Sequence, residues 1–137
     1  MQPDCVFCKL IARQIPASIV FEDEATLAFM DLGQVNPGHV LVASKAHAAN
    51  VYDLDDAQAA AVFRTAARVA RAVRAAFDPP GLSIYQANGK PAGQTVLHFH
   101  LHVLPRHEGD GMQLVWPVKN PPRERLEEHC AKIRARL

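Results

Sequence analysis

The stretch VLHFHLHVLP, residues 96–105, alternates histidine with apolar side chains at a strict period of two. Successive side chains of a β-strand point to opposite faces, so this pattern predicts a strand with two unlike faces. The apolar face is expected to pack on the core, and the histidine face must border a wet or polar site. The faces carry His98, His100 and His102 on one side, and Leu97, Phe99, Leu101 and Val103 on the other.

The three histidines are compatible with two kinds of site. Imidazole titrates near physiological pH and is also a common metal ligand. Next-but-one residues lie about 6–7 Å apart along a strand, so a phosphate-sized group can meet two neighbouring rings. One metal ion bound by all three rings demands more curvature, although His-x-His pairs do hold zinc and iron. The alternation alone therefore leaves a metal site and a catalytic site open.

The approach to this strand, NGKPAGQTV at residues 88–96, is rich in glycine. Such a loop can expose backbone N–H groups, and Gln94 and Thr95 add side-chain donors. Donors of this kind suit the oxygens of a phosphate. An ordinary turn explains the glycines equally well, but the position beside the histidine strand favours phosphate binding.

The rest of the chain predicts mostly strands with one long helix. The helix is expected over residues 53–77, with Asp53 or Asp55 as N-cap, arginines on its wet side, and Phe63 within its apolar stripe. This order predicts an α+β domain whose helix packs on an antiparallel sheet of about five strands. The expected strands are residues 18–23, 26–31, 39–45, 82–88 and 96–105, and shorter helices are expected at residues 5–13 and 123–137.

Size and charge narrow the function classes. The 137 residues suit a single domain, and a formal net charge of +1 gives no field that favours nucleic-acid or membrane binding. The N-terminal residues lack the features of a signal peptide, and no apolar run is long enough to span a membrane. Three cysteines do not suggest a disulfide framework. We therefore expect a cytoplasmic protein.

The sequence resembles the histidine triad (HIT) family. HFHLHVL matches the triad pattern at every position, and AGQTV and PRHEGDG resemble the flanks found in that family. So do CVFCKLIARQIPASIVFEDEATLAFMD near the N-terminus and NPGHVLVASKAH in the middle. The resemblance runs from about Cys5 to Gly111, which leaves residues 112–137 as a tail within a single domain, residues 1–137. It implies the HIT-like fold.

The resemblance implies a nucleotide hydrolase that cleaves at the α-phosphorus of nucleoside phosphoramidates or dinucleoside polyphosphates. His100 is then the nucleophile that forms a nucleotidyl-histidine intermediate, and His102 contacts the phosphate and the leaving group. Histidine at position 102, where the uridylyltransferase branch has glutamine, favours hydrolysis over transfer. The implied catalytic set is His98, His100, His102, His39 and Thr95. The implied nucleotide-binding set is Asp31, Leu32, Asn88, Gln94, Thr95, Phe7 and Leu10.

The Cys-x-x-Cys pair of Cys5 and Cys8 has the spacing of half a zinc site, or of a redox pair, or of two buried thiols. The resemblance to bacterial family members implies a structural zinc. Its ligands are then Cys5, Cys8, His47 and His98, a Cys2His2 set that suits a closed tetrahedral site. No metal is required for the chemistry.

The resemblance also implies a purine nucleotide or nucleotide conjugate as ligand, and a homodimer. The tail at residues 113–122 is similar to family tails that border the partner's pocket, with Trp116 as the candidate contact. A nucleotide-binding regulatory protein with little turnover is the alternative function. A metalloprotein whose triad itself binds metal is a third.

Overall fold

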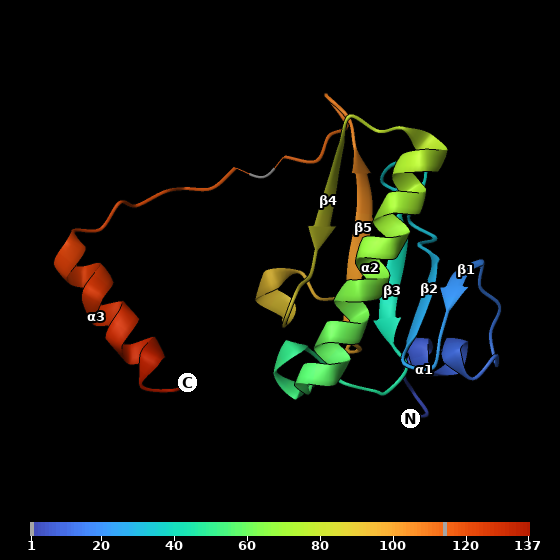
Figure 1. Cartoon of the computed structure of the whole chain (residues 1–137), viewed down its shortest axis with the longest axis horizontal. Helices are drawn as coiled ribbons and strands as arrows, with labels where there is room; N and C mark the ends of the chain where they lie inside the picture. Colours follow the sequence, from blue (N-terminus) through green and yellow to red (C-terminus); the bar gives the residue numbers. More distant parts are fainter. Residues whose placement is uncertain (1, 114) are drawn as a thin grey trace.

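The computed structural model describes residues 2–113 and 115–137, and it contains one five-stranded sheet with a long helix across one face (Figure 1). All neighbouring strands are antiparallel, in the order β1-β2-β3-β5-β4. The predicted α+β class is therefore confirmed. The strands are β1 (Ile19–Glu22), β2 (Thr26–Met30), β3 (Val40–Ser44), β4 (Gly81–Tyr85) and β5 (His100–Arg106), and the helices are α1 (Val6–Ile11), α2 (Asp56–Phe77) and α3 (Arg123–Arg134).

Helix α2 begins later than residue 53. Asp55 is its N-cap, and a capping box with Gln58 satisfies two backbone N–H groups that the first turn leaves free. The preceding Val51–Asp53 forms a separate 3-10 turn. The predicted stripe packs on the sheet, but Phe63 is exposed, so its assignment to the stripe was wrong. The buried residues of α2 are Ala61, Val62, Thr65, Ala66, Val69 and Val73.

Strand β5 begins at His100, four residues after the start that the alternation predicts. The chain bends over residues 96–98, where the N–H of His98 donates to the carbonyl of Val96 at 2.9 Å. Leu97 is consequently 65% exposed, which corrects its expected place on the core face. The other apolar residues of the pattern pack toward α2, as predicted. They are Phe99, Leu101 and Val103.

Helix α1 packs on the second face of the sheet, beside β2 and β3 (Figure 1). Phe7 and Leu10 of this helix pack with Leu27 and Phe29 of β2, and Leu41 of β3 joins them. The short helix thus closes a second hydrophobic cluster, on the face opposite α2. This is the face that carries the histidines of β5.

We expect Leu27→Ala to lower the free energy of unfolding by about 2–5 kcal/mol, because it leaves a cavity in the second cluster. Leu27 is 0% exposed. Urea denaturation measures the change. Leu126→Ala is the matched control, because Leu126 on α3 is 50% exposed and surface changes usually stay within about 0.5 kcal/mol. Equal effects of the two substitutions contradict this description of the core.

The tail leaves the domain after β5. Residues 115–137 are all exposed, and α3 lies apart from the sheet at the end of an extended segment (Figure 1). Leu114, within the tail segment singled out above, lies outside the described residues. Over the described part of the chain, the structure offers no helix with the length and apolar character of a membrane span.

Candidate functional site

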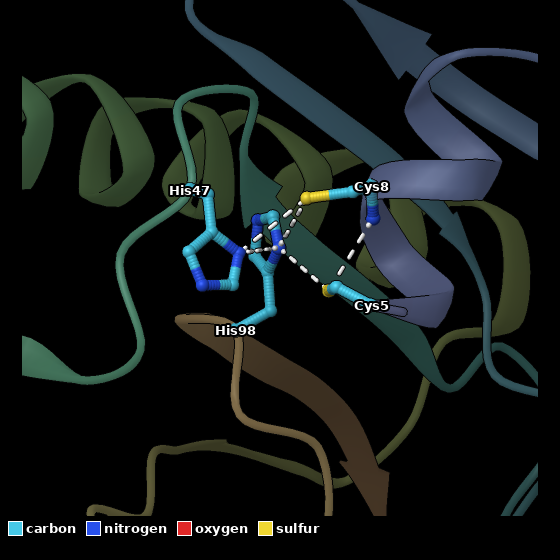
Figure 2. A group of neighbouring side chains, drawn as sticks. All are labelled: Cys5, Cys8, His47 and His98. Carbon is cyan, nitrogen blue, oxygen red and sulfur yellow. Dashed lines mark hydrogen bonds between the residues drawn. The ribbon is translucent and has the colours of Figure 1, made fainter. Parts of the chain in front are cut away.

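Two cysteines and two histidines from distant parts of the chain meet at one end of the sheet (Figure 2). Cys5 caps the N-terminus of α1, and Cys8 lies in its first turn. His47 follows β3, and His98 precedes β5. Figure 2 shows all four side chains directed toward a common centre, with both histidines presenting Nδ1. The predicted metal ligands are therefore brought together.

The spacing of these donors fits a metal ion. A tetrahedral site with ordinary zinc bond lengths has S–N edges of about 3.5 Å and N–N edges of about 3.3 Å. Here the Sγ of Cys5 lies 3.3 Å from Nδ1 of His98, and the Sγ of Cys8 lies 3.4 Å from Nδ1 of His47. The two Nδ1 atoms are 3.3 Å apart. The cluster can thus bind a structural metal such as zinc.

The backbone orients one of the ligand rings. Nε2 of His98 lies 2.7 Å from the carbonyl oxygen of Ser44, to which it donates. This bond places the proton on Nε2 and leaves the lone pair of Nδ1 directed at the two cysteines. Burial also lowers the pKa of His98, which favours the neutral ring that a metal requires. The carbonyl of Ser44 carries no sequence signal, so the sequence did not reveal this contact.

A cavity of about 250 Å³ lies next to the cluster of Cys5, Cys8, His47 and His98, between α1 and the histidine face of the sheet. Its wall is mostly apolar. Among the predicted site residues it is lined by Phe7, Leu10, Asp31, Leu32, Thr95, His100 and His102. The same wall also includes residues that were not predicted, namely Val6, Ala17, Ser18, Phe29 and Leu41.

His100 is the buried histidine of the cavity. Its Nδ1 lies 2.7 Å from the carbonyl oxygen of His98, and a carbonyl only accepts, so Nδ1 carries the proton. Nε2 therefore holds a free lone pair. Burial lowers the pKa of this ring, and the ring of Phe7 packs edge-on against it at 5.1 Å between centroids. The neutral imidazole is thus held in one tautomer and orientation.

His102 interacts with His39, the residue that directly precedes the neighbouring strand β3. Nε2 of His39 lies 2.9 Å from Nδ1 of His102, and the N–H of Val35 faces Nδ1 of His39 at 3.4 Å. Since Val35 donates, His39 carries its proton on Nε2 and donates to His102, whose own proton is then on Nε2. Burial lowers the pKa of His102 to about 4, and His100 and His39 add to the effect.

Asp31 completes this group. Its Oδ1 accepts from the N–H of Gly33 at 2.9 Å, and its Oδ2 lies 3.4 Å from Nε2 of His39. Gln34 braces the same loop by donating to the carbonyls of Asp31 and His39 and accepting from the N–H of Gly38. Gln34 is not among the predicted site residues, because nothing in the local sequence distinguishes it from any other loop glutamine.

Two predicted residues are engaged elsewhere. The side-chain N–H groups of Gln94 donate to the carbonyls of Ala49 and Val96, and its oxygen accepts from the N–H of Gly89. The oxygen of Asn88 accepts from the N–H of Val51. Neither side chain lines the cavity, whereas Thr95 is exposed at its rim.

We expect stability to fall on acidification between about pH 6.5 and pH 4, partly through His102. In this window the unfolded chain binds a proton at His102 and the folded chain does not, so the free energy of unfolding rises with pH. Urea denaturation at successive pH values measures the slope, with metal content checked at each pH. His102→Gln should show a shallower slope, and an unchanged slope contradicts the assigned burial effect.

The fold and the paired cavity-facing histidines define a histidine triad domain, and comparisons with known proteins agree. The HIT domain family profile matches residues 12–109, and the chain belongs to the HIT family. It is 47% identical to "Protein hit" of Bacillus subtilis over 114 residues, which cover 82% of this chain and 79% of that protein.

Two further relatives bear on structure and activity. The crystal structure of a HIT family protein from Bacillus anthracis superposes with a TM-score of 0.95 at 39% identity, over 100% of this chain and 99% of that one. The chain is 34% identical to the adenosine 5'-monophosphoramidase hnt1 of Schizosaccharomyces pombe, over 82% of this chain and 83% of that protein. The predicted family and HIT fold are therefore confirmed.

Proposed function

We propose that the protein binds a purine nucleotide conjugate in the cavity and hydrolyses it at the α-phosphorus. The observation that carries the proposal is the bond from Nδ1 of His100 to the carbonyl of His98, because it leaves Nε2 as a free nucleophile. Phosphoramidates and dinucleoside polyphosphates are the proposed substrates. The likeness to the phosphoramidase of S. pombe supports the first class.

In the first step, Nε2 of His100 attacks the α-phosphorus and the bond from phosphorus to the leaving group breaks. The N–H at Nε2 of His102 donates a hydrogen bond to the leaving group, which departs as a phosphate anion or, for an amine, takes its proton from solvent. The tautomer assigned above supports this role, since His39 donates to Nδ1 of His102 and so keeps the His102 proton on Nε2. His39 is therefore proposed as a positioning residue.

In the second step, water attacks phosphorus and the N–P bond to His100 breaks. The product is a nucleoside monophosphate, and Nε2 of His100 recovers its lone pair. One proton of the water passes to solvent and the other stays on the phosphate, while His102 keeps the proton on Nε2 and its hydrogen bond to the phosphate. Both residues thereby end in their starting states, and the sequence of steps requires no metal.

The cavity lining supports the proposed contacts to the nucleotide. Phe7, Leu10 and Leu32 contact the base, Asp31 accepts from the ribose hydroxyls, and Thr95 donates to the phosphate. We propose that Gln94 and Asn88 act by holding the loop that presents Thr95. Gln94 bonds to backbone groups, and Asn88 bonds to the backbone N–H of Val51 and to the side chain of Gln86. His98 is proposed to support His100 through its carbonyl while it binds metal through its ring.

We further propose that Cys5, Cys8, His47 and His98 hold a structural zinc ion, which ties α1 to the sheet.

We also propose that residues 1–137 form one domain, with residues 112–137 as a tail, and that this domain acts as a homodimer. The edge position of β4 and the exposed Trp116 of the tail support a second copy as partner. Analytical sedimentation tests the dimer, and a purely monomeric protein contradicts it.

A substrate panel tests the function. We expect release of AMP from adenosine phosphoramidate or a diadenosine polyphosphate at rates well above those for a nucleotide sugar. Chromatography of the products measures each rate, and calorimetry measures AMP binding to the same preparation. Binding of AMP without turnover of any substrate overturns the hydrolase and favours the regulatory alternative.

A further inference from the structure

Asp31, His39 and His102 form a second group of metal-ligand atoms, apart from the cysteine-containing cluster. The separations are 2.9 Å from Nε2 of His39 to Nδ1 of His102, 3.4 Å from that Nε2 to Oδ2 of Asp31, and 3.8 Å from Oδ2 to Nδ1 of His102. The fold fixes the positions of all three atoms. His102 is on β5 and His39 directly precedes the neighbouring strand β3, while the carboxylate of Asp31 accepts a hydrogen bond from the N–H of Gly33.

The size of this triangle matches a metal ion. A circle through three atoms with these separations has a radius of about 2.0 Å, which is an ordinary zinc–nitrogen or zinc–oxygen bond length. An ion on or just outside this plane therefore contacts all three atoms once the proton of His39 moves from Nε2 to Nδ1, which gives up the 3.4 Å contact between Nδ1 and the N–H of Val35. His39 is buried, but Asp31 and His102 line the cavity, so an ion reaches the group from the cavity side.

The donor set selects the kind of ion. Two imidazoles and one carboxylate favour zinc and its neighbours among the transition metals, whereas Mg²⁺ prefers an all-oxygen shell. Three protein ligands also leave a coordination position free, unlike the four-ligand cluster around Cys5 and Cys8. Burial lowers the pKa of His39 and of His102, so both rings are neutral near pH 7, as ligands must be.

We propose that Asp31, His39 and His102 form a second divalent-metal site, selective for zinc over magnesium, inside the cavity. The ion replaces the proton that His39 shares with His102. It also occupies the carboxylate and the ring that the nucleotide is proposed to contact. Zinc and nucleotide therefore exclude one another, a consequence that rests on the proposed function, whereas metal binding itself does not.

Calorimetry on the full chain tests the site. Protein whose cysteine cluster is filled, as shown by one zinc per chain in elemental analysis, is titrated with Zn²⁺ and, separately, with Mg²⁺. We expect one further equivalent of Zn²⁺ and none of Mg²⁺. Asp31→Asn and His102→Gln should each weaken the binding of this second Zn²⁺ ion. The loss of affinity should exceed the roughly 10–100-fold that is typical when only an outer-shell partner of a ligand is removed. Asp53→Asn is the matched control and should bind as the parent does.

Each result has one meaning. A parent protein that takes up no further zinc overturns the proposal, and so does a further equivalent that persists unchanged in both variants. Circular dichroism shows whether the variants are folded, and His102→Gln serves if Asp31→Asn is not. Titration of AMP into the same protein without added zinc tests the nucleotide site separately. AMP that binds without weakening Zn²⁺ uptake overturns the mutual exclusion.

Discussion

Replacement of His100 by alanine should abolish turnover of adenosine phosphoramidate while AMP still binds. Loss of a catalytic nucleophile typically lowers kcat by roughly 10⁴-fold or more. The physical reason is that Nε2 of His100 is the proposed attacking atom, held as a free lone pair by the bond at Nδ1. Affinity should change far less, because the proposed base and ribose contacts, including Phe7 and Asp31, remain in the cavity.

Single-turnover kinetics and calorimetry measure the two quantities on the same preparation. His107→Ala is the matched control, since His107 is an exposed histidine just beyond β5 and outside the cavity lining. Mass spectrometry of parent protein quenched in alkali should also find the nucleotide attached to the peptide that contains His100. An alanine variant that remains fully active rules out the covalent mechanism.

Local sequence patterns predicted most of the fold. Alternation, helical spacing and turn residues predicted the hairpin of β1 and β2, strand β3 and helix α2. These signals involve only residues close together in the sequence, so they can be read without knowledge of the tertiary structure. The start of β5 was not predictable in this way. His98 turns out of the alternation toward Cys5, a residue far away in the sequence, and this turn exposes Leu97.

The sequence indicated which residues to expect at the candidate site, but not the hydrogen bonds between them. The triad pattern singled out His100 and His102, and the resemblance added His39 and Asp31. Which nitrogen carries each proton depends on the carbonyl of His98 and the N–H of Val35, which are backbone groups without sequence signal. The same limit applies to the short separations among Asp31, His39 and His102, which depend on sheet register.

Helix α1 links the cluster of Cys5, Cys8, His47 and His98 to the cavity. It supplies Cys5 and Cys8 on one side, and its Phe7 packs edge-on against both His98 and His100, at 5.8 and 5.1 Å between ring centroids. A six-residue helix is too short to be stable by itself, so its position depends on these tertiary contacts. The metal ion proposed at the cluster therefore also holds one wall of the nucleotide cavity.

Cys5→Ser should remove the metal and lower the thermal stability of the domain sharply. Serine is a favoured N-cap residue, so the substitution keeps the cap of α1 and removes one ligand. A metal present at 1,000 times its Kd stabilises the folded state by about 4 kcal/mol, and loss of that amount lowers Tm by on the order of 10 °C in a domain of this size. Elemental analysis and calorimetric unfolding measure the two effects.

The matched control for this loss is Cys130→Ser, because Cys130 is an exposed thiol on α3 and lies outside the cluster. It should retain about one zinc per chain and the parent Tm. A chelator should lower the Tm of the parent and of Cys130→Ser, but not that of Cys5→Ser, since that variant has no structural metal left to lose. If Cys5→Ser keeps its zinc, or loses it with no change in Tm, the metal does not hold α1 against the sheet.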